Sequence, residues 1–225
     1  MTSRPLIYVV LVIAAAVLFW IGIDLFASTQ SDLRKFDPDA VAQLETDMWR
    51  SYYDRHELRL FLQLAEMLRT QYGIPFFRSN FIAFHAAKAA FIFKDGKSRS
   101  DYERALPDVI DYYESIRRVS STPFSVEETA KLELEWWIIH RERESHSPED
   151  LYRSLAELQA AIYEIPVARF LEHARLRGDA MLLRDAKWES GGVSESDWAR
   201  IHELLRQSWR ELWMEVQPQA RSATS

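Results

Sequence analysis

The sequence predicts an all-α protein in which a single N-terminal transmembrane helix precedes a compact body of about six or seven helices. Three observations support this prediction. Residues 6–23 contain no charged side chain. Along the rest of the chain, apolar residues recur at the three- and four-residue spacing of amphipathic helices, and helix-capping signals return at short intervals, whereas alternating strand patterns are nearly absent. We expect either a helical bundle or stacked helical hairpins.

The uncharged segment 6–23 is long enough to cross a bilayer. An α-helix rises about 1.5 Å per residue, so such a stretch covers most of the roughly 30 Å hydrocarbon layer. A cleaved signal peptide is the alternative, because Ala27 and Ser28 offer a small-residue cleavage site. The stretch is longer than a usual signal core, however, and Trp20 and Asp24 are typical of interface anchors, so we expect an uncleaved anchor.

The positions of the basic residues and the helix signals divide the chain. Arg4 precedes the span, and the next basic residues lie well past its other end, which favours a body on the outer side of the membrane. We expect four segments: a transmembrane anchor over 1–28, a linker over 29–37, an all-helical soluble domain over 38–217 and a disordered tail over 218–225.

The body opens with a strong helix start. Asp37 can cap a helix with Pro38 in its first turn, and apolar residues then recur as far as Gly73. The segment 38–72 is therefore either one long helix or two helices joined near 54–57. The next segment, 75–94, is apolar on most faces, so we expect it to be the central buried helix of the domain.

Further helices are expected downstream, each after a local start signal. These signals are Ser98 or Ser100, the capping box at Ser125, the pair Ser147-Pro148, the apolar set from Val167, and the capping pattern at Ser194 after Gly191-Gly192.

Charge and cysteine content exclude several classes of function. The formal net charge is −6, and acidic and basic residues are interspersed, so no basic stripe is available to follow a phosphate backbone and we expect no nucleic-acid partner. The chain has no Cys, which removes disulfides, thiolate metal sites and Cys nucleophiles.

A carboxylate and histidine site between helices is the only chemistry that the residues suggest. Ferritin-like di-iron bundles need Glu-x-x-His pairs, and the chain contains none, so we expect no metal and no cofactor. Weaker candidates for a catalytic or binding site lie on or near apolar helix faces: Glu45, His85, Glu114, Glu133 and His140. The alternative interpretation is that these groups form hydrogen bonds inside or at the edge of the core.

Aromatic and arginine residues favour a protein interface. Trp136 and Trp137 are adjacent on one helix and point about 100° apart, so both cannot face the same core. Tryptophan and arginine dominate protein interfaces, although tryptophans also fill cores. The candidate interface residues are Trp136, Trp137, Trp198, Arg206, Trp209, Arg210 and Trp213.

The first helical segment of the body offers a different surface. Trp49 and Arg50 in 38–72 are typical of a helix that rests on lipid head groups. Nearby acids such as Glu45 and Asp47 argue against this, because an anionic leaflet would repel them.

Two short runs carry a resemblance to a known group of proteins. The run 44–53, LETDMWRSYY, and the run 134–137, LEWW, resemble those of membrane-anchored helical proteins from bacteria such as Acidobacteria. The resemblance implies a bacterial source, and hence a body in the periplasm, but that family has no assigned activity and implies nothing about mechanism.

Two classes of function follow. We expect a non-catalytic accessory subunit or adaptor, which is held in the bilayer by 6–23 and docks onto other proteins of a larger respiratory, photosynthetic, transport or envelope complex. The alternative is a helical-bundle enzyme, or a protein that binds a metal or cofactor, with the carboxylate and histidine site between its helices.

Overall fold

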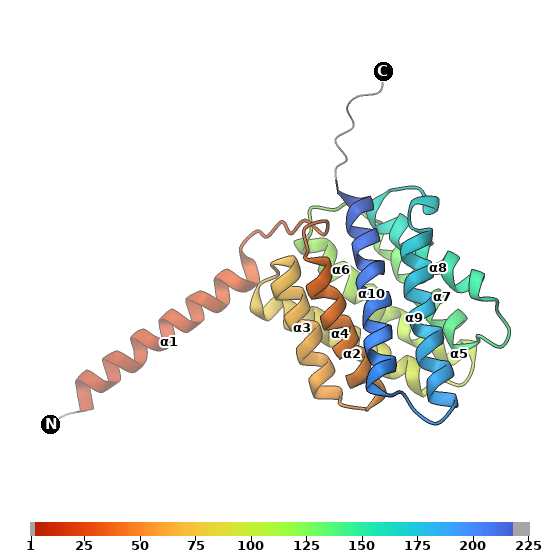
Figure 1. Ribbon diagram of the computed structural model, residues 1–225. Helices are drawn as coiled ribbons and strands as arrows, with labels where there is room; N and C mark the ends of the chain where they lie inside the picture. Colours follow the sequence, from red (N-terminus) through yellow and green to blue (C-terminus); the bar gives the residue numbers. More distant parts are fainter. Residues whose placement is uncertain (1–2, 218–225) are drawn as a thin grey trace, which may run out of the picture.

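The N-terminal helix α1 stands away from the rest of the protein. The computed structural model describes residues 3–217, so the tail predicted over 218–225 lies outside the described residues. α1 (Ser3–Phe26) projects from the body (Figure 1), and residues 6–20 of its apolar stretch Leu6–Phe26 are all exposed. The chain therefore has, as predicted, an N-terminal helix apolar and long enough to span a membrane.

The far end of α1 is fixed to the body. The Asp24 carboxylate accepts hydrogen bonds from the backbone amides of Phe77, at 3.1 Å, and Arg78, at 3.4 Å, in the first turn of α4. The rings of Trp20 and Phe77 lie 5.2 Å apart. Amides in the first turn of a helix have no partner within the helix, so a carboxylate from α1 caps α4.

The body consists of helices joined by short connections. Its long helices are α2 (Pro38–Tyr53), α3 (Glu57–Tyr72), α4 (Phe76–Asp95), α6 (Leu106–Val119), α7 (Val126–Arg141), α8 (Pro148–Tyr163), α9 (Leu171–Glu189) and α10 (Glu195–Val216). The connections hold the short helix α5 (Arg99–Tyr102) and the 3-10 turns η1 (Glu103–Ala105) and η2 (Val167–Arg169). Over residues 3–217 there is no strand, only an isolated bridge between Ser31 and Ser120.

These helices form a closed ring in chain order (Figure 1). Each long helix packs against the next one along the chain, and α10 packs against α2 as well as α9. Connections of a few residues favour antiparallel neighbours, which explains the sequential packing. Among the helices of residues 38–217, those on opposite sides of the ring have few close backbone contacts, so side chains occupy the space between them.

The segment 38–72 forms two helices and not one long helix. Arg55 adopts a left-handed conformation with φ 61° between α2 and α3, which ends the first helix. Residues 38–217 accordingly hold eight long helices, one more than the larger number expected from the sequence. Three local start signals are confirmed in full: Asp37 caps α2, and Ser147 and Ser194 form capping boxes for α8 and α10. Others are confirmed in part, because Ser125 accepts from the Glu128 amide without completing a capping box, Ser98 caps only the short α5, and the helix expected from Val167 begins at Leu171.

The segment predicted to be the central buried helix, α4, is not central. Ile82, Ala83 and Ala89 face the inside and are buried, whereas Phe81 and Phe84 are 57% and 53% exposed. The prediction was wrong because, among the described helices, a ring leaves every member with an outer face, and apolar residues on that outer face were taken as a sign of burial.

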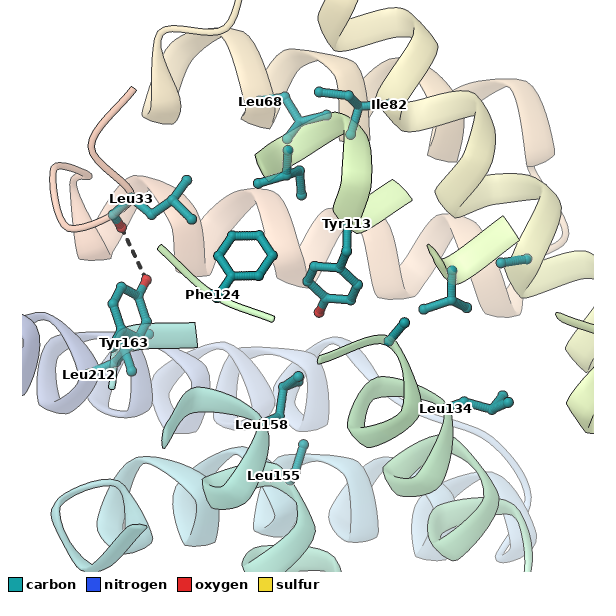
Figure 2. Close-up of a cluster of buried hydrophobic side chains, with 14 of the residues drawn as sticks. Leu33, Leu68, Ile82, Tyr113, Phe124, Leu134, Leu155, Leu158, Tyr163 and Leu212 are labelled. Carbon is teal, nitrogen blue, oxygen red and sulfur yellow. Dashed lines mark hydrogen bonds between the residues drawn. The ribbon is translucent and has the colours of Figure 1, made fainter. Parts of the chain in front are cut away.

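The segment predicted to be a linker, 29–37, packs against the body through part of its length. Leu33 and Phe36 are buried in the core, and Ser31 donates a backbone hydrogen bond to the carbonyl of Val119 at 2.7 Å. Figure 2 shows the Tyr163 hydroxyl donating to the backbone carbonyl of Leu33, a bond of 3.1 Å. The same view shows Leu33 and Phe124 among the buried side chains that converge inside the ring.

Candidate functional site

A cavity of about 390 Å³ lies inside the ring. Residues from each of the eight ring helices line it, and most of them are aromatic or aliphatic. On α4 the lining residues include Ala86, Ala89 and Ala90, whose small side chains leave space that the aromatic residues opposite do not fill. Cavities of this size hold small organic molecules in other proteins.

A buried ion pair joins three helices at the cavity wall. The Arg177 guanidinium on α9 donates to Glu45 on α2 through Nε at 3.0 Å and Nη2 at 2.7 Å. The Trp209 indole on α10 donates to the other Glu45 oxygen at 2.5 Å. Burial opposes the charge of Arg177, but Glu45 and then Glu133 outweigh it, so the pKa of Arg177 is raised.

A second carboxylate, Glu133 on α7, is held by neutral donors. The Tyr113 hydroxyl donates to it at 2.8 Å and the Trp137 indole at 2.9 Å. Burial, followed by the charge of Glu133, raises the pKa of Tyr113 well above its ordinary value. Tyr113 therefore stays protonated and keeps donating at neutral pH.

Several donors at the wall have no acceptor within residues 3–217. The Trp136 indole Nε1 is buried without a hydrogen-bond partner. The hydroxyls of Tyr72 and Tyr112 and the Nη1 group of Arg177 also form no hydrogen bond within that range, and all four residues line the cavity. Burial raises the pKa of both tyrosines, and Glu45 adds to the effect at Tyr72 and Glu133 at Tyr112. Both hydroxyls can therefore donate to an acceptor inside the cavity.

A further polar group lies beside the cavity residues Tyr53 and His140. His140 Nε2 lies 3.0 Å from a carboxylate oxygen of Asp185, whose other oxygen accepts from Arg184 at 2.9 Å. Burial raises the pKa of Asp185, but the neighbouring His140 and Arg184 outweigh it, so the pKa is lowered. The Arg184 guanidinium in turn lies over the ring of Tyr53 at 3.1 Å.

The structure brings together three of the five predicted site residues. Glu45, Glu133 and His140 line the cavity. Glu114 lies on the outer part of α6, where it pairs with Arg118 at 3.0 Å.

His85 also lies outside the cavity. Its Nδ1 atom is 3.5 Å from Asp108 and 3.7 Å from Asp111, and the ligand atoms of these three residues lie within 4.8 Å of one another. The Lys88 ammonium already lies 2.9 Å from the same Asp108 oxygen, so the carboxylate has a cation without a metal.

The candidate interface residues do not form one exposed surface. Trp136 and Trp137 line the cavity, Trp198 is 8% exposed, and Trp209 bonds to Glu45 inside the ring. Arg206 pairs with Glu203 on its own helix and Arg210 with Asp39 on α2. Only Trp213, among the seven, is an exposed aromatic.

Three of these residues, Trp198, Trp209 and Arg210, instead face α2. The contacts between α10 and α2 include Arg210 with Asp39, the Trp209 hydrogen bond to Glu45, and Arg50 with Glu195 at 2.9 Å. Arg50 also stacks over Trp198 at 5.0 Å. These tryptophan and arginine residues form an interface between two helices of the same chain. Such an interface needs the same desolvated contacts as an interface with a partner protein.

The sequence did not reveal the cavity residues Arg177, Tyr72 and Tyr112. Arg177 lies between Leu176 and Gly178 on a helix of mixed polarity, and nothing local marks it as buried. Its position becomes informative only once Glu45 is known to be opposite. Tyr72 and Tyr112 follow the apolar stripes of their helices, as ordinary core residues do.

Comparison of the chain with protein-family models, with curated proteins and with solved structures finds no match. The function must therefore be argued from the ring, its cavity and α1.

Proposed function

We propose that the protein is a membrane-anchored receptor that binds a neutral, largely apolar small molecule inside its ring of helices. The observation that carries this proposal is the cavity of about 390 Å³, whose wall combines aromatic and aliphatic side chains with a few polar groups. A large apolar cavity with a small number of placed polar groups is the usual form of a binding site for small organic molecules.

The hydrogen bonds at the wall favour a ligand with an oxygen acceptor. Each oxygen of Glu45 and Glu133 already accepts a hydrogen bond. The groups that remain include the donors on Trp136, Tyr72, Tyr112 and Arg177. A carbonyl or hydroxyl oxygen on the ligand would satisfy them.

The charges at the wall favour a neutral ligand. Two carboxylates, Glu45 and Glu133, face one guanidinium, Arg177, so an anion would meet a net negative wall. The site between helices that the sequence predicted is thus a binding site. Glu45 and Glu133 hold its wall in place, and neither takes part in a reaction.

The attachment of α1 supports an uncleaved anchor. Cleavage near Ala27 would remove the Asp24 carboxylate that caps α4 and the Trp20 ring that packs on Phe77. A signal peptide that is removed after export would contribute neither contact to the mature protein. A body on the periplasmic side of a bacterial membrane remains part of the proposal, and protease digestion of intact and opened cells tests that orientation.

The accessory-subunit function stays a prediction. It requires an exposed docking surface, and the residues expected to form one lie mostly inside the ring or on the α10–α2 contact. A pull-down from a mild detergent extract, followed by mass spectrometry, tests it.

The binding proposal is tested with a neutral fluorescent ketone, 6-propionyl-2-dimethylaminonaphthalene. The full chain is placed in lipid nanodiscs, and the signal of empty nanodiscs is subtracted. Ala90→Phe fills part of the cavity, whereas Ala199→Phe adds the same side chain to an exposed position of α10. We expect saturable binding to the unmodified protein and to Ala199→Phe, and loss of binding in Ala90→Phe.

Two further measurements examine the chemistry of the wall. Tyr112→Phe removes one free donor and is expected to weaken binding of the ketone by roughly two- to tenfold. The anionic probe 1-anilinonaphthalene-8-sulfonate is expected to bind the cavity more weakly than the neutral ketone. Equal binding of the ketone to Ala90→Phe and Ala199→Phe would show that the cavity is not the site, and the proposal would fail.

A further inference from the structure

The outer side of α3 and α4 carries exposed apolar residues that the cavity does not explain. Leu58 is 72% exposed and Leu62 53%, and the phenylalanines Phe76, Phe81 and Phe84 are each about half exposed. We call these five residues the α3–α4 apolar face. Contiguous exposed apolar residues of this kind mark a contact with lipid or with another protein.

The two helices contribute to one continuous surface. α3 and α4 are antiparallel neighbours joined by three residues. Leu58, Leu62, Glu66 and Arg69 lie on one stripe of α3, because they are spaced by four, four and three residues, and Glu66 is exposed one turn before Arg69. The Arg69 guanidinium lies over the ring of Phe76 on α4 at 5.3 Å, so this stripe borders α4.

The apolar face begins where α1 leaves the body. Trp20 packs on Phe76, with ring centroids 6.1 Å apart, and Asp24 caps the first turn of α4. Figure 1 shows α1 departing beside α3 and α4. If α1 spans the bilayer, Trp20 lies at the interface depth, and the start of α4 is held at the same depth.

The charges on α4 suit lipid contact. Between Arg78 and Lys88 the only titratable residue is His85, and it faces Asp108 and Asp111 on α6. An apolar stretch with basic residues at both ends is typical of a helix that lies in the interface of a membrane.

We infer that the α3–α4 apolar face rests in the interface of the same bilayer that α1 spans, so that the ring lies on the membrane surface. This inference rests on the anchoring by α1 proposed above. It differs from contact through the tryptophan and arginine residues of α2, because Trp49 lines the cavity and Arg50 binds α10.

Single-cysteine labelling tests the inference, because the chain has no native Cys. The full chain carries a nitrobenzoxadiazole label at one introduced Cys and is reconstituted in vesicles of phosphatidylcholine and phosphatidylglycerol with brominated acyl chains, which quench labels in contact with lipid. The variants Phe84→Cys and Leu62→Cys report on the apolar face. The matched control is Trp188→Cys, an equally exposed apolar position on α9, across the ring, and Leu11→Cys reports on the span.

We expect the labels at 84, 62 and 11 to lose most of their emission in brominated vesicles and the label at 188 to keep its emission. Unquenched labels at 84 and 62 with a quenched label at 11 would overturn the lipid contact and leave the anchor intact. An unquenched label at 11 as well would overturn the anchoring and the inference together. Labels at 84 and 62 that are exposed to water in lipid vesicles but shielded in native membranes would identify a protein partner and reject lipid.

Discussion

Replacing Glu45 by Gln is expected to destabilise the ring strongly. The substitution keeps the size of the side chain and an acceptor for Trp209, but it leaves the buried Arg177 guanidinium without its paired charge. Removing one partner of a buried pair costs about 3–5 kcal/mol. Glu133 also interacts with Arg177, which places the expected loss near the lower end, at about 3 kcal/mol. For a chain of this size that loss lowers the melting temperature by roughly 6–12 °C.

The matched control is Asp39→Asn, which breaks the exposed pair between Asp39 and Arg210 on the same α2–α10 contact. Solvent screens that pair, so the control is expected to unfold close to the unmodified protein. The measurement is urea unfolding of the full chain in a mild detergent, followed by circular dichroism. The double variant Glu45→Gln, Arg177→Met removes both charges and is expected to recover part of the loss. If Glu45→Gln and Asp39→Asn lose the same small amount, the buried pair does not hold the three helices together.

Three other outcomes can be measured in the same unfolding assay. Burial lowers the pKa of His173 from 6.5 to about 3, so the unfolded chain takes up a proton below pH 6.5 that the folded ring does not. The free energy of unfolding is therefore highest above pH 6.5 and is expected to be about 2 kcal/mol lower at pH 5. His173→Gln is expected to remove this pH dependence. Gly178→Ala places a Cβ atom 2.6 Å from the ring of Tyr152 and is expected to cost about 1–3 kcal/mol, with relief in the double variant Gly178→Ala, Tyr152→Ser. Asp24→Ala removes the cap on the amides of Phe77 and Arg78 and is expected to cost about 1 kcal/mol, and an unchanged midpoint would contradict the attachment of α1 to α4.

Local signals in the sequence predict the helices well. The starts of α2, α8 and α10 follow from Asp37, Ser147 and Ser194, because a capping side chain binds amides of its own first turn. The uncharged run predicts α1 for a similar reason, since a membrane span is a property of consecutive residues. These features need no knowledge of the rest of the fold.

The closure of the ring could not be predicted in this way. Periodicity shows that Glu45 and Trp209 face inward on their helices, but their contact joins positions 164 residues apart in the chain. The same limit applies to Phe84, whose apolar side chain predicted burial and which is exposed because α4 has an outer face. Periodicity identifies the face of a helix, and only the packing of the whole chain decides which helix, or which solvent, that face meets.

The two ends of the ring lie next to each other. Gln217, just after α10, donates a side-chain hydrogen bond of 2.9 Å to the backbone carbonyl of Arg34, just before α2. Each helix thus packs against a helix that follows within a few dozen residues. Only the contact between α10 and α2 joins residues from opposite ends of the body. This pattern favours rapid folding with one late step. A circularly permuted chain, joined between these ends and opened at Gly191-Gly192, is expected to assemble the same ring from a different starting point.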